Sequence, residues 1–294
     1  MDLKHYMERC RASVDKQLLS LLPSKDMRPE KLHQAMHYSV FAGGKRIRPI
    51  LMIASCEAVG GDISQVLPTA CAMEMIHTYS LIHDDLPAMD DDNFRRGIAT
   101  NHKVFGEDTA ILAGDALLTQ AFITLSAATT PITIDKQTQV LNIIATASGA
   151  AGMVGGQVID MEAEGDVVDL DTVNYIHSHK TGALILASIQ CGALIGGADK
   201  KAFTALTSFG QDAGLAFQIA DDILDIEGNQ QQLGKDIGSD QQRGKATYPA
   251  VMGVEKSRQR MEQLQRQAMD KLIHFGDNAE ALRQISQYII NRSS

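Results

Sequence analysis

The sequence predicts an all-α protein that folds as a single large helical bundle. Three observations predict this class: apolar residues recur at helical spacing along most of the chain, period-two alternation is nearly absent, and β-branched clusters are rare. The chain has 294 residues, 44% of them apolar, so it can bury a large core. We expect residues 1–294 to form one domain of roughly ten helices or more.

The first two helices are predicted by apolar stripes. The first stripe steps by threes and fours through Leu3, Met7, Cys10, Val14, Leu18 and Leu21. The second repeats the pattern at Leu32, Met36 and Val40, and Pro23 and Pro29 bracket the break between the two helices.

Glycine and proline punctuate the rest of the chain. Gly43-Gly44 ends the second helix, and Pro49 starts a third that runs to Gly60-Gly61. A long helix from about Gln65 reaches Asp84, loop residues follow to about residue 106, and a polar loop spans residues 228–247. The remaining helices are expected near residues 109–128, 137–157, 171–195, 201–227, 249–273 and 278–291.

Composition excludes several classes of protein. The 36 acidic and 27 basic side chains leave a net charge of -9, which argues against a sequence-independent grip on nucleic acid. Three uncharged stretches, residues 116–134, 137–159 and 181–198, are diluted by polar residues and glycine, so we expect buried helices rather than membrane spans. The N-terminus, MDLKHYMERC, has no apolar segment, and the four cysteines form no CxxC pair, so a cytoplasmic protein is expected.

The segment QIADDILD, residues 218–225, places carboxylates on one face of a predicted helix. Asp221 and Asp225 are four residues apart, and Gln218 precedes Asp221 by three, so all three share a stripe. Like charges at this spacing repel one another and weaken a helix. A divalent cation would offset the repulsion, and carboxylates with room for water and for substrate phosphate oxygens suit Mg²⁺.

The segment HDDLPAMDDDNFRRG, residues 83–97, is the other acidic cluster. Asp84 and Asp90 are six residues apart and would point apart on an unbroken helix. Pro87 lies between them and distorts the preceding turn, so we expect a local bulge to bring Asp90 back beside Asp84. His77 lies seven residues before Asp84 and shares its face.

An acidic run is usually a solvated surface, and that interpretation would suit either cluster alone. Both clusters, however, are embedded in apolar segments, SLIHDDLPAM and AFQIADDILDI. Carboxylates flanked by Ile, Leu and Phe are more often partly buried, and buried charges need partners. The residues therefore favour metal binding.

Basic residues gather in short segments close to these clusters. Each segment alone fits a solvated turn or surface. The GGKRIRP segment, however, stands at a predicted helix start, where free backbone N–H groups also favour anions. The candidates are Lys45, Arg48, Arg95, Arg96, Lys180, Lys235 and Lys245. Two metal-binding faces and two cationic sets suggest two diphosphate groups, one chelated through Mg²⁺ and one held mainly by side chains.

Taken in order, these segments resemble the trans-isoprenyl diphosphate synthase family, in particular its bacterial farnesyl diphosphate synthase (geranyltranstransferase) type. The resemblance runs through GGKRIRP, IHTYSLIHDDLPAMDDDNFRRG, ILAGDALL, GGQVID, HKTGALI, FQIADDILD and GKDIGSDQQRGKATYP. It implies the isoprenoid synthase fold, an all-α bundle around a deep apolar cavity, usually as a homodimer. It also implies head-to-tail condensation of isopentenyl diphosphate with dimethylallyl or geranyl diphosphate to a C15 product, with C20 or C10 as the alternative.

The resemblance further implies roles for individual residues. Mg²⁺ ions, three in the family, would bind Asp84, Asp85, Asp90, Asp221, Asp222 and Asp225. The allylic diphosphate would be surrounded by Arg95, Lys180, Thr181, Gln218, Lys235 and Lys245. Isopentenyl diphosphate would be held by Lys45, Arg48, His77 and Arg96.

Product length in this family depends partly on the fifth residue before the first aspartate motif. Here that residue is Tyr79, followed by Ser80. Five residues of helix rise by about 7.5 Å, so an aromatic ring there is expected to stop a growing tail early and to favour C15. The alternative is that Tyr79 only packs in the core.

Three other functions are open to the same residues. The His83-Asp84 pair could belong to a metal phosphohydrolase, although the second acidic cluster would then be unused. A terpene cyclase shares the first motif but usually carries Asn, Ser and Glu in the second. A non-catalytic subunit typically loses part of one acidic motif, and both are intact here.

Overall fold

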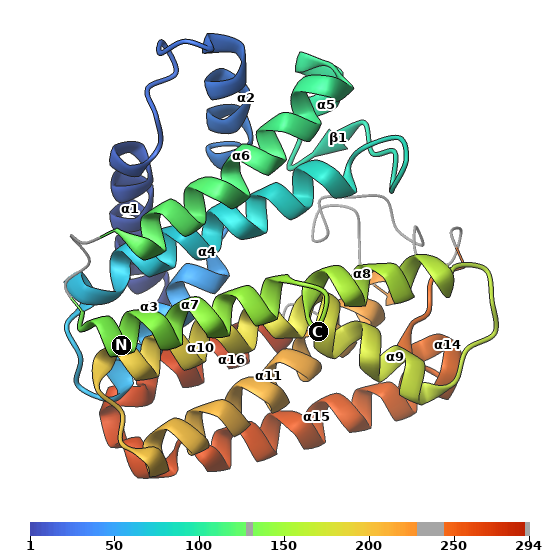
Figure 1. Ribbon diagram of the computed structural model, residues 1–294. Helices are drawn as coiled ribbons and strands as arrows, with labels where there is room; N and C mark the ends of the chain where they lie inside the picture. Colours follow the sequence, from blue (N-terminus) through green and yellow to red (C-terminus); the bar gives the residue numbers. More distant parts are fainter. Residues whose placement is uncertain (128–131, 228–243, 292–294) are drawn as a thin grey trace.

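The structure, a computed structural model, describes residues 1–127, 132–227 and 244–291 (Figure 1). Most of these residues are helical, and the strands among them form one hairpin of two residues on each side, which confirms the all-α prediction.

The N-terminal half contains the helices that the apolar stripes and the glycine breaks predict. Its elements are α1 (Leu3–Leu21), α2 (Glu30–Val40), α3 (Ile47–Ala58), α4 (Ile63–Asp84), the strands β1 (Phe94–Arg95) and β2 (Ile98–Ala99), α5 (Asn101–Phe105) and α6 (Glu107–Ser126). The expected loop up to residue 106 thus contains the hairpin and a short helix.

The C-terminal half is more interrupted than the sequence predicts. Its elements are α7 (Ile134–Ser148), α8 (Met153–Glu162), α9 (Leu170–Ile176), the π-helix η1 (His177–Thr181), α10 (Gly182–Gly196), α11 (Lys200–Glu227), α14 (Tyr248–Met252), α15 (Val254–Lys271), the 3₁₀ segment η2 (Ile273–Ala279) and α16 (Glu280–Asn291).

Three expected helices are therefore divided. The helix over 137–157 breaks between α7 and α8, where a Cβ on Gly152 would lie 2.2 Å from the Ala147 carbonyl oxygen. The helix over 171–195 contains a π-turn, and the helix over 249–273 breaks at Gly253, whose φ is 80°. Glycine allows the breaks at Gly152 and Gly253, because only glycine readily tolerates such close backbone contact or adopts such a backbone conformation.

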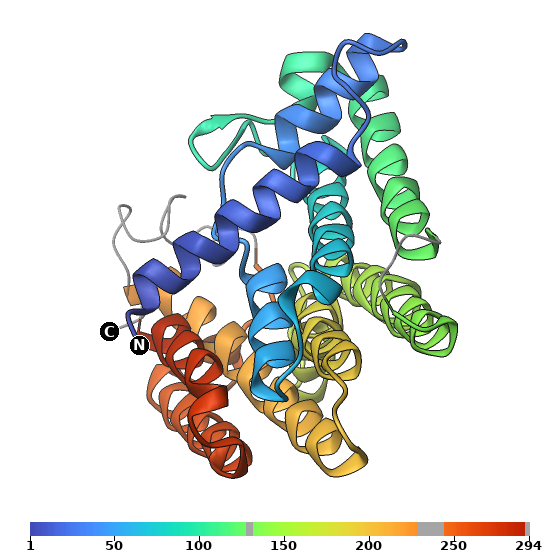
Figure 2. The ribbon, with the colours of Figure 1, turned by 90° about the vertical axis from the view of Figure 1, so that its left-hand side faces the viewer.

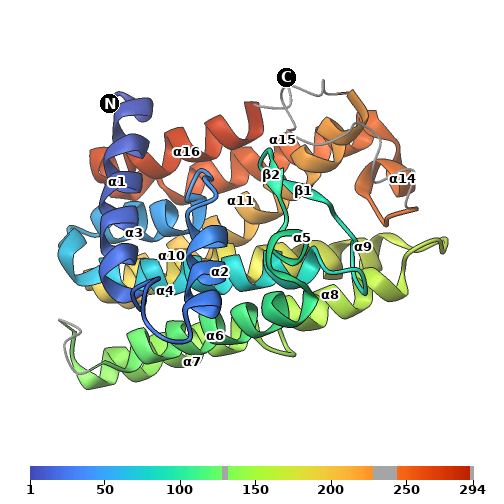
Figure 3. The ribbon, with the colours of Figure 1, turned by 90° about the horizontal axis from the view of Figure 1, so that it is seen from above.

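Helix α4 runs through the middle of the bundle and packs against α6, α3, α10, α1 and α2. In Figure 1, α4 and α6 lie side by side above, and α10, α11 and α15 lie below. The start of α1 lies beside α16 (Figure 2), and the view from above shows α6, α7 and α8 along one side with α15 and α16 along the other (Figure 3). The end of α4 thus faces α8, η1 and α11 across the bundle.

Among the described residues, α6 is the one helix long and apolar enough to cross a membrane by length and composition. It packs along α4, and eight of its residues, including Ala113, Gly114 and Leu117, are buried within the bundle. The four cysteines are unpaired and buried, and burial raises the pKa of the Cys56 thiol to about 11. They are packing residues of the core.

Candidate active site

A cavity of about 1430 Å³ opens between the end of α4 and the helices that face it. Its wall combines three kinds of side chain. Carboxylates come from Asp84, Asp90 and Asp221, and cations come from Arg48, Arg95, Lys180 and Lys245. Apolar and aromatic groups include Tyr79, Ile111, Met153, Val158 and Phe217.

The first acidic motif reverses direction after α4 ends at Asp84. The backbone N–H of Asp90 donates to the Asp84 carbonyl at 2.8 Å, and the N–H of Asp91 donates to the Leu86 carbonyl at 3.1 Å. The predicted return of Asp90 to Asp84 is thus present, although the helix ends instead of bulging. Burial raises the pKa of Asp84; the Lys180 ammonium opposes this shift, and the Asp90 carboxylate adds to it. Two carboxylates therefore share one region of the cavity.

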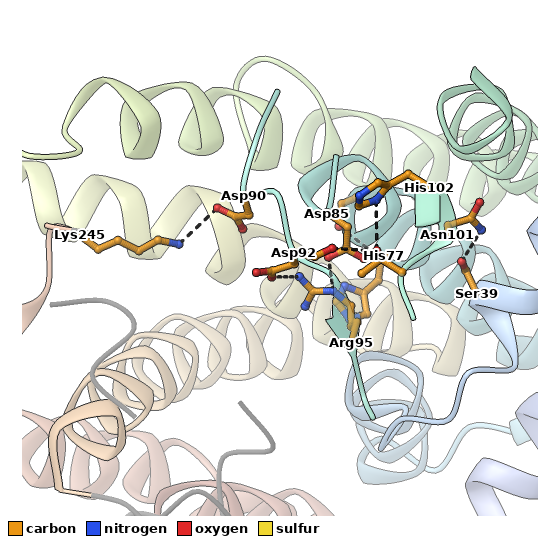
Figure 4. Close-up of polar contacts among 11 residues, drawn as sticks. Ser39, His77, Asp85, Asp90, Asp92, Arg95, Asn101, His102 and Lys245 are labelled. Carbon is orange, nitrogen blue, oxygen red and sulfur yellow. Dashed lines mark hydrogen bonds and ion pairs between the residues drawn. The ribbon is translucent and has the colours of Figure 1, made fainter. Parts of the chain in front are cut away.

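Asp85 points to Arg95 rather than into the cavity (Figure 4). The Arg95 Nε–H donates to Asp85 Oδ1 at 2.6 Å, and its NH2 group donates to Asp92 Oδ2 at 3.3 Å. Burial raises the pKa of Asp85 to about 6, and the Arg95 guanidinium opposes the shift. Asp85 thereby holds Arg95 at the cavity edge, and direct metal binding by Asp85 stays a prediction.

The second acidic motif divides in the same way. Asp221 and Gln218 both line the cavity, as their shared helical stripe predicts. Asp222 accepts hydrogen bonds through Oδ2 from His177 Nε2 at 2.8 Å and from the Tyr248 backbone N–H at 2.9 Å. Asp225 is 2% exposed and does not line the cavity. Metal binding by Asp222 and Asp225 also stays a prediction, because both are buried and neither lines the cavity.

Lys180 and Thr181 reach the cavity from the π-helix η1. The extra residue of a π-turn changes which side chains face inward, and such turns are frequent at functional sites. The Lys180 ammonium donates to Asp160 Oδ2 of α8 at 2.5 Å. A Cβ on Gly156 would lie 2.2 Å from the Lys180 backbone nitrogen, so glycine permits the close approach of α8 and η1 that forms this ion pair.

A separate cationic set forms around the GGKRIRP segment. A Cβ on Gly44 would lie 2.7 Å from the guanidinium carbon of Arg96. An N–H group of the same guanidinium donates a hydrogen bond to the Gly43 carbonyl. Burial lowers the pKa of Arg48 to about 10, against the opposing charge of Glu74. Burial, and after it the guanidinium of Arg48, lowers the pKa of His77 well below its usual range. Arg48 and His77 line the cavity, so this set presents a neutral imidazole beside guanidinium groups.

The remaining predicted cations lie at the margins. Lys45 is exposed, and its ammonium lies 5.6 Å from the centre of the Tyr288 ring. Lys245 lines the cavity, with its ammonium 3.8 Å from Asp90 Oδ1 (Figure 4). Lys235 lies outside the described residues. Tyr79 and Ser80 both line the cavity one helical turn before Asp84.

The structure adds two residues that the sequence reasoning missed. Asp160, the partner of Lys180, stands in the GGQVID segment, where a lone carboxylate among glycine and apolar residues was the available signal. Glu74 is 1% exposed and pairs with Arg46, close to the GGKRIRP cations. A glutamate in the apolar segment CAMEMI was the signal for it.

Comparisons with known proteins agree with this geometry. The sequence profile described as polyprenyl synthetase matches residues 29–289. A farnesyl diphosphate synthase of Geobacillus stearothermophilus is 52% identical over 79% of this chain and 79% of its own. A geranylgeranyl diphosphate synthase of Cyanophora paradoxa is 49% identical over 90% of this chain and 89% of its own. The crystal structure of a geranyltransferase from Helicobacter pylori, complexed with magnesium and isoprenyl diphosphate, has a TM-score of 0.84 at 30% identity, covering 98% of this chain and 96% of its own.

Proposed function

Because this chain belongs to the polyprenyl synthetase family and is therefore a prenyltransferase, we propose that it condenses isopentenyl diphosphate head-to-tail with allylic diphosphates, with farnesyl diphosphate (C15) as its main product. The observation that carries the proposal is the cavity itself. Its carboxylates suit a metal-bound diphosphate, its cations suit two diphosphates, and its apolar groups suit an isoprenoid tail.

The side chains present fit Mg²⁺ bound jointly with a diphosphate. Asp84 and Asp90 line the cavity from the end of α4, and Asp221 lines it from α11. Within the described ranges, no three acidic, histidine or cysteine side chains form a group that could hold an ion alone. Mg²⁺ usually keeps waters and takes substrate phosphate oxygens, so carboxylates from two elements match an ion whose coordination the diphosphate completes.

Catalysis on this surface is mainly electrostatic. Bound Mg²⁺ would supply a Lewis acid for the leaving diphosphate. The ammonium groups of Lys180 and Lys245 line the same cavity, and Asp85 holds the Arg95 guanidinium at its edge. These fixed cations stabilise the charge that the diphosphate gains as it departs, and one such donor typically contributes about 3 kcal/mol.

The carbon chemistry then needs no protein nucleophile. The allylic C–O bond breaks and the diphosphate leaves with both electrons. The double bond of isopentenyl diphosphate attacks the allylic carbon, and a proton passes to the released diphosphate. Thr181 and Gln218 line the cavity beside the ionising group, and Phe217 and Met153 help to exclude water, which would capture the cation.

Isopentenyl diphosphate is proposed to bind at the separate cationic set of Lys45, Arg48, His77 and Arg96. Burial removes part of the hydration of the Arg48 guanidinium, so this group gains from an anionic partner. The buried Nε of Arg48 makes no hydrogen bond to any described residue, which leaves a donor for that anion.

A C15 product is supported by Tyr79, which is 7% exposed and lines the cavity one turn before Asp84. An aromatic ring there limits the depth open to a growing tail. The relatives include both farnesyl and geranylgeranyl synthases, so C20 is the alternative product.

We further propose a cytoplasmic homodimer. Large apolar side chains are exposed on α6 outside the cavity, at Leu112 and Ile123. Such a surface suits burial against a second copy of the chain.

The direct test incubates the purified protein with isopentenyl diphosphate, Mg²⁺ and either dimethylallyl or geranyl diphosphate, and identifies the products by chromatography. C15 product from both primers, lost on chelation of Mg²⁺, is expected. Asp221→Asn should lower the rate by about 10²-fold or more, whereas Asp212→Asn on the same helix, away from the cavity, should not. Hydrolysis of a single diphosphate without condensation would contradict the proposal.

A further inference from the structure

The Tyr79 ring borders the ring of His83, one helical turn further along α4. The two ring centres lie 5.7 Å apart and the planes meet at 81°, an edge-to-face contact. Both side chains line the cavity. Within the described part of the chain, the Tyr79 hydroxyl makes no hydrogen bond, so packing against neighbours such as His83 sets the position of the ring.

His83 itself is fixed against α6. Its Nε2 lies 3.0 Å from the Ile111 carbonyl oxygen, which can only accept, so Nε2–H donates. The imidazole also occupies the space over Gly114, where an added Cβ would lie 2.2 Å from Nε2. The histidine ring therefore fills the gap between α4 and α6 beside Tyr79.

These contacts form a continuous path from α6 to the cavity. Gly114 leaves room for His83, the Ile111 carbonyl orients the imidazole, and the imidazole closes the side of Tyr79 towards α6. Without the imidazole, the tyrosine ring could swing into the vacated space and uncover the cavity beyond it.

We propose that His83 is a specificity-determining residue: wedged between Gly114 and Tyr79, it limits product length by holding the tyrosine ring across the cavity. This inference rests on the proposed prenyl transfer and acts on its chain-length selectivity. It assigns His83 a positioning role through Tyr79, separate from the diphosphate and metal chemistry of the neighbouring Asp84.

The test compares farnesyl with geranyl diphosphate as primer, by the ratio of their kcat/KM values, because a ratio is insensitive to a general loss of activity. His83→Ala should raise the farnesyl-to-geranyl ratio and the C20 fraction by about tenfold or more, the scale on which one packing change in an apolar pocket discriminates substrates. His83→Gln, which can still donate to the Ile111 carbonyl, should fall between wild type and His83→Ala. The double variant Tyr79→Ala/His83→Ala should match Tyr79→Ala alone, because both changes act on one ring.

Gly114→Ala is a second test, and it changes none of the side chains that line the cavity. Its methyl group should displace the imidazole towards the cavity, so elongation of geranyl diphosphate should fall by about tenfold relative to dimethylallyl diphosphate. Adding His83→Ala should abolish this effect, since no ring is left to displace. Gly214→Ala is the matched helix-glycine control, because its nearest neighbour would lie at an ordinary 3.6 Å.

An unchanged primer ratio in His83→Ala would overturn the inference, as would independent, multiplying effects of His83→Ala and Tyr79→Ala. Wild-type protein that already extends farnesyl as well as geranyl diphosphate would refute the proposed C15 product instead. A wild type without prenyl transfer would refute the proposed function as a whole.

Discussion

Replacing Glu74 tests how the GGKRIRP segment is held in place. Arg46 is 4% exposed, and its backbone is in the left-handed conformation, with φ of 52°. Its guanidinium donates to Glu74 Oε1 at 2.8 Å, to Asp15 Oδ1 at 2.9 Å and to the Val40 carbonyl at 2.6 Å. These bonds join α1, α2 and α4 to the segment that carries Lys45 and Arg48.

The magnitude follows from burial. The Arg46 and Glu74 side chains are each 2% exposed, whereas Asp15 is 36% exposed. Glu74→Gln keeps the shape and one acceptor but leaves Arg46 compensated only by the solvated Asp15. Breaking a buried pair typically costs about 3–5 kcal/mol, and two charges about 4 Å apart at an effective dielectric of 20 interact by about 4 kcal/mol. We expect Glu74→Gln to lower the free energy of unfolding by about 3 kcal/mol or slightly more.

Urea unfolding followed by circular dichroism measures the loss, with Asp15→Asn as the matched control. The control removes the exposed partner of the same arginine and should cost less than about 1 kcal/mol. If Glu74→Gln cost no more than Asp15→Asn, the buried pair would not hold this segment and the reasoning would fail.

Three further predictions concern the cavity. Burial and nearby guanidinium groups lower the pKa of His77, so its imidazole is neutral, and a bound diphosphate would raise that pKa. Binding of isopentenyl diphosphate near pH 6 should therefore take up more protons in wild type than in His77→Gln, and this difference should shrink at pH 8. Calorimetry in two buffers measures the proton uptake. Asp160→Asn should release the Lys180 ammonium and lower kcat/KM for geranyl diphosphate by about tenfold while the KM for isopentenyl diphosphate stays the same; equal effects on both substrates would contradict it. Asp222→Ala should cost about 1–3 kcal/mol of unfolding free energy, because buried donors of His177 and Tyr248 lose their acceptor, and a loss below 0.5 kcal/mol would exclude this anchoring role.

Much of the fold could be predicted from local pattern. Apolar residues at helical spacing predicted α1 and α2, and Gly43-Gly44 and Pro49 predicted the break before α3. The helix breaks inside the C-terminal half escaped prediction because they depend on close backbone packing. Gly152 sits at such a break, and the π-turn at Lys180 packs directly on Gly156.

The site could be predicted in composition better than in geometry. Asp84, Asp90, Asp221 and Gln218 reach the cavity as spacing and the proline break suggested. Asp222, adjacent to Asp221, faces His177 instead, because neighbouring helix residues point about 100° apart and only the tertiary structure shows what each one meets.

The long-range ion pairs could not be predicted from the sequence for the same reason. Asp160 of α8 pairs with Lys180 of η1, and Glu74 of α4 pairs with Arg46, whose own backbone is left-handed. No local spacing in the sequence encodes either contact.

The proposed chemistry requires that carboxylates from the end of α4 and from α11 jointly hold Mg²⁺ with an allylic diphosphate. A crystal structure with Mg²⁺ and a non-ionising allylic diphosphate analogue tests it most directly. We expect ions bonded both to the diphosphate and to Asp84, Asp90 and Asp221, with the tail pointing towards Tyr79. A diphosphate bound elsewhere, or ions that touch none of these three carboxylates, would contradict it.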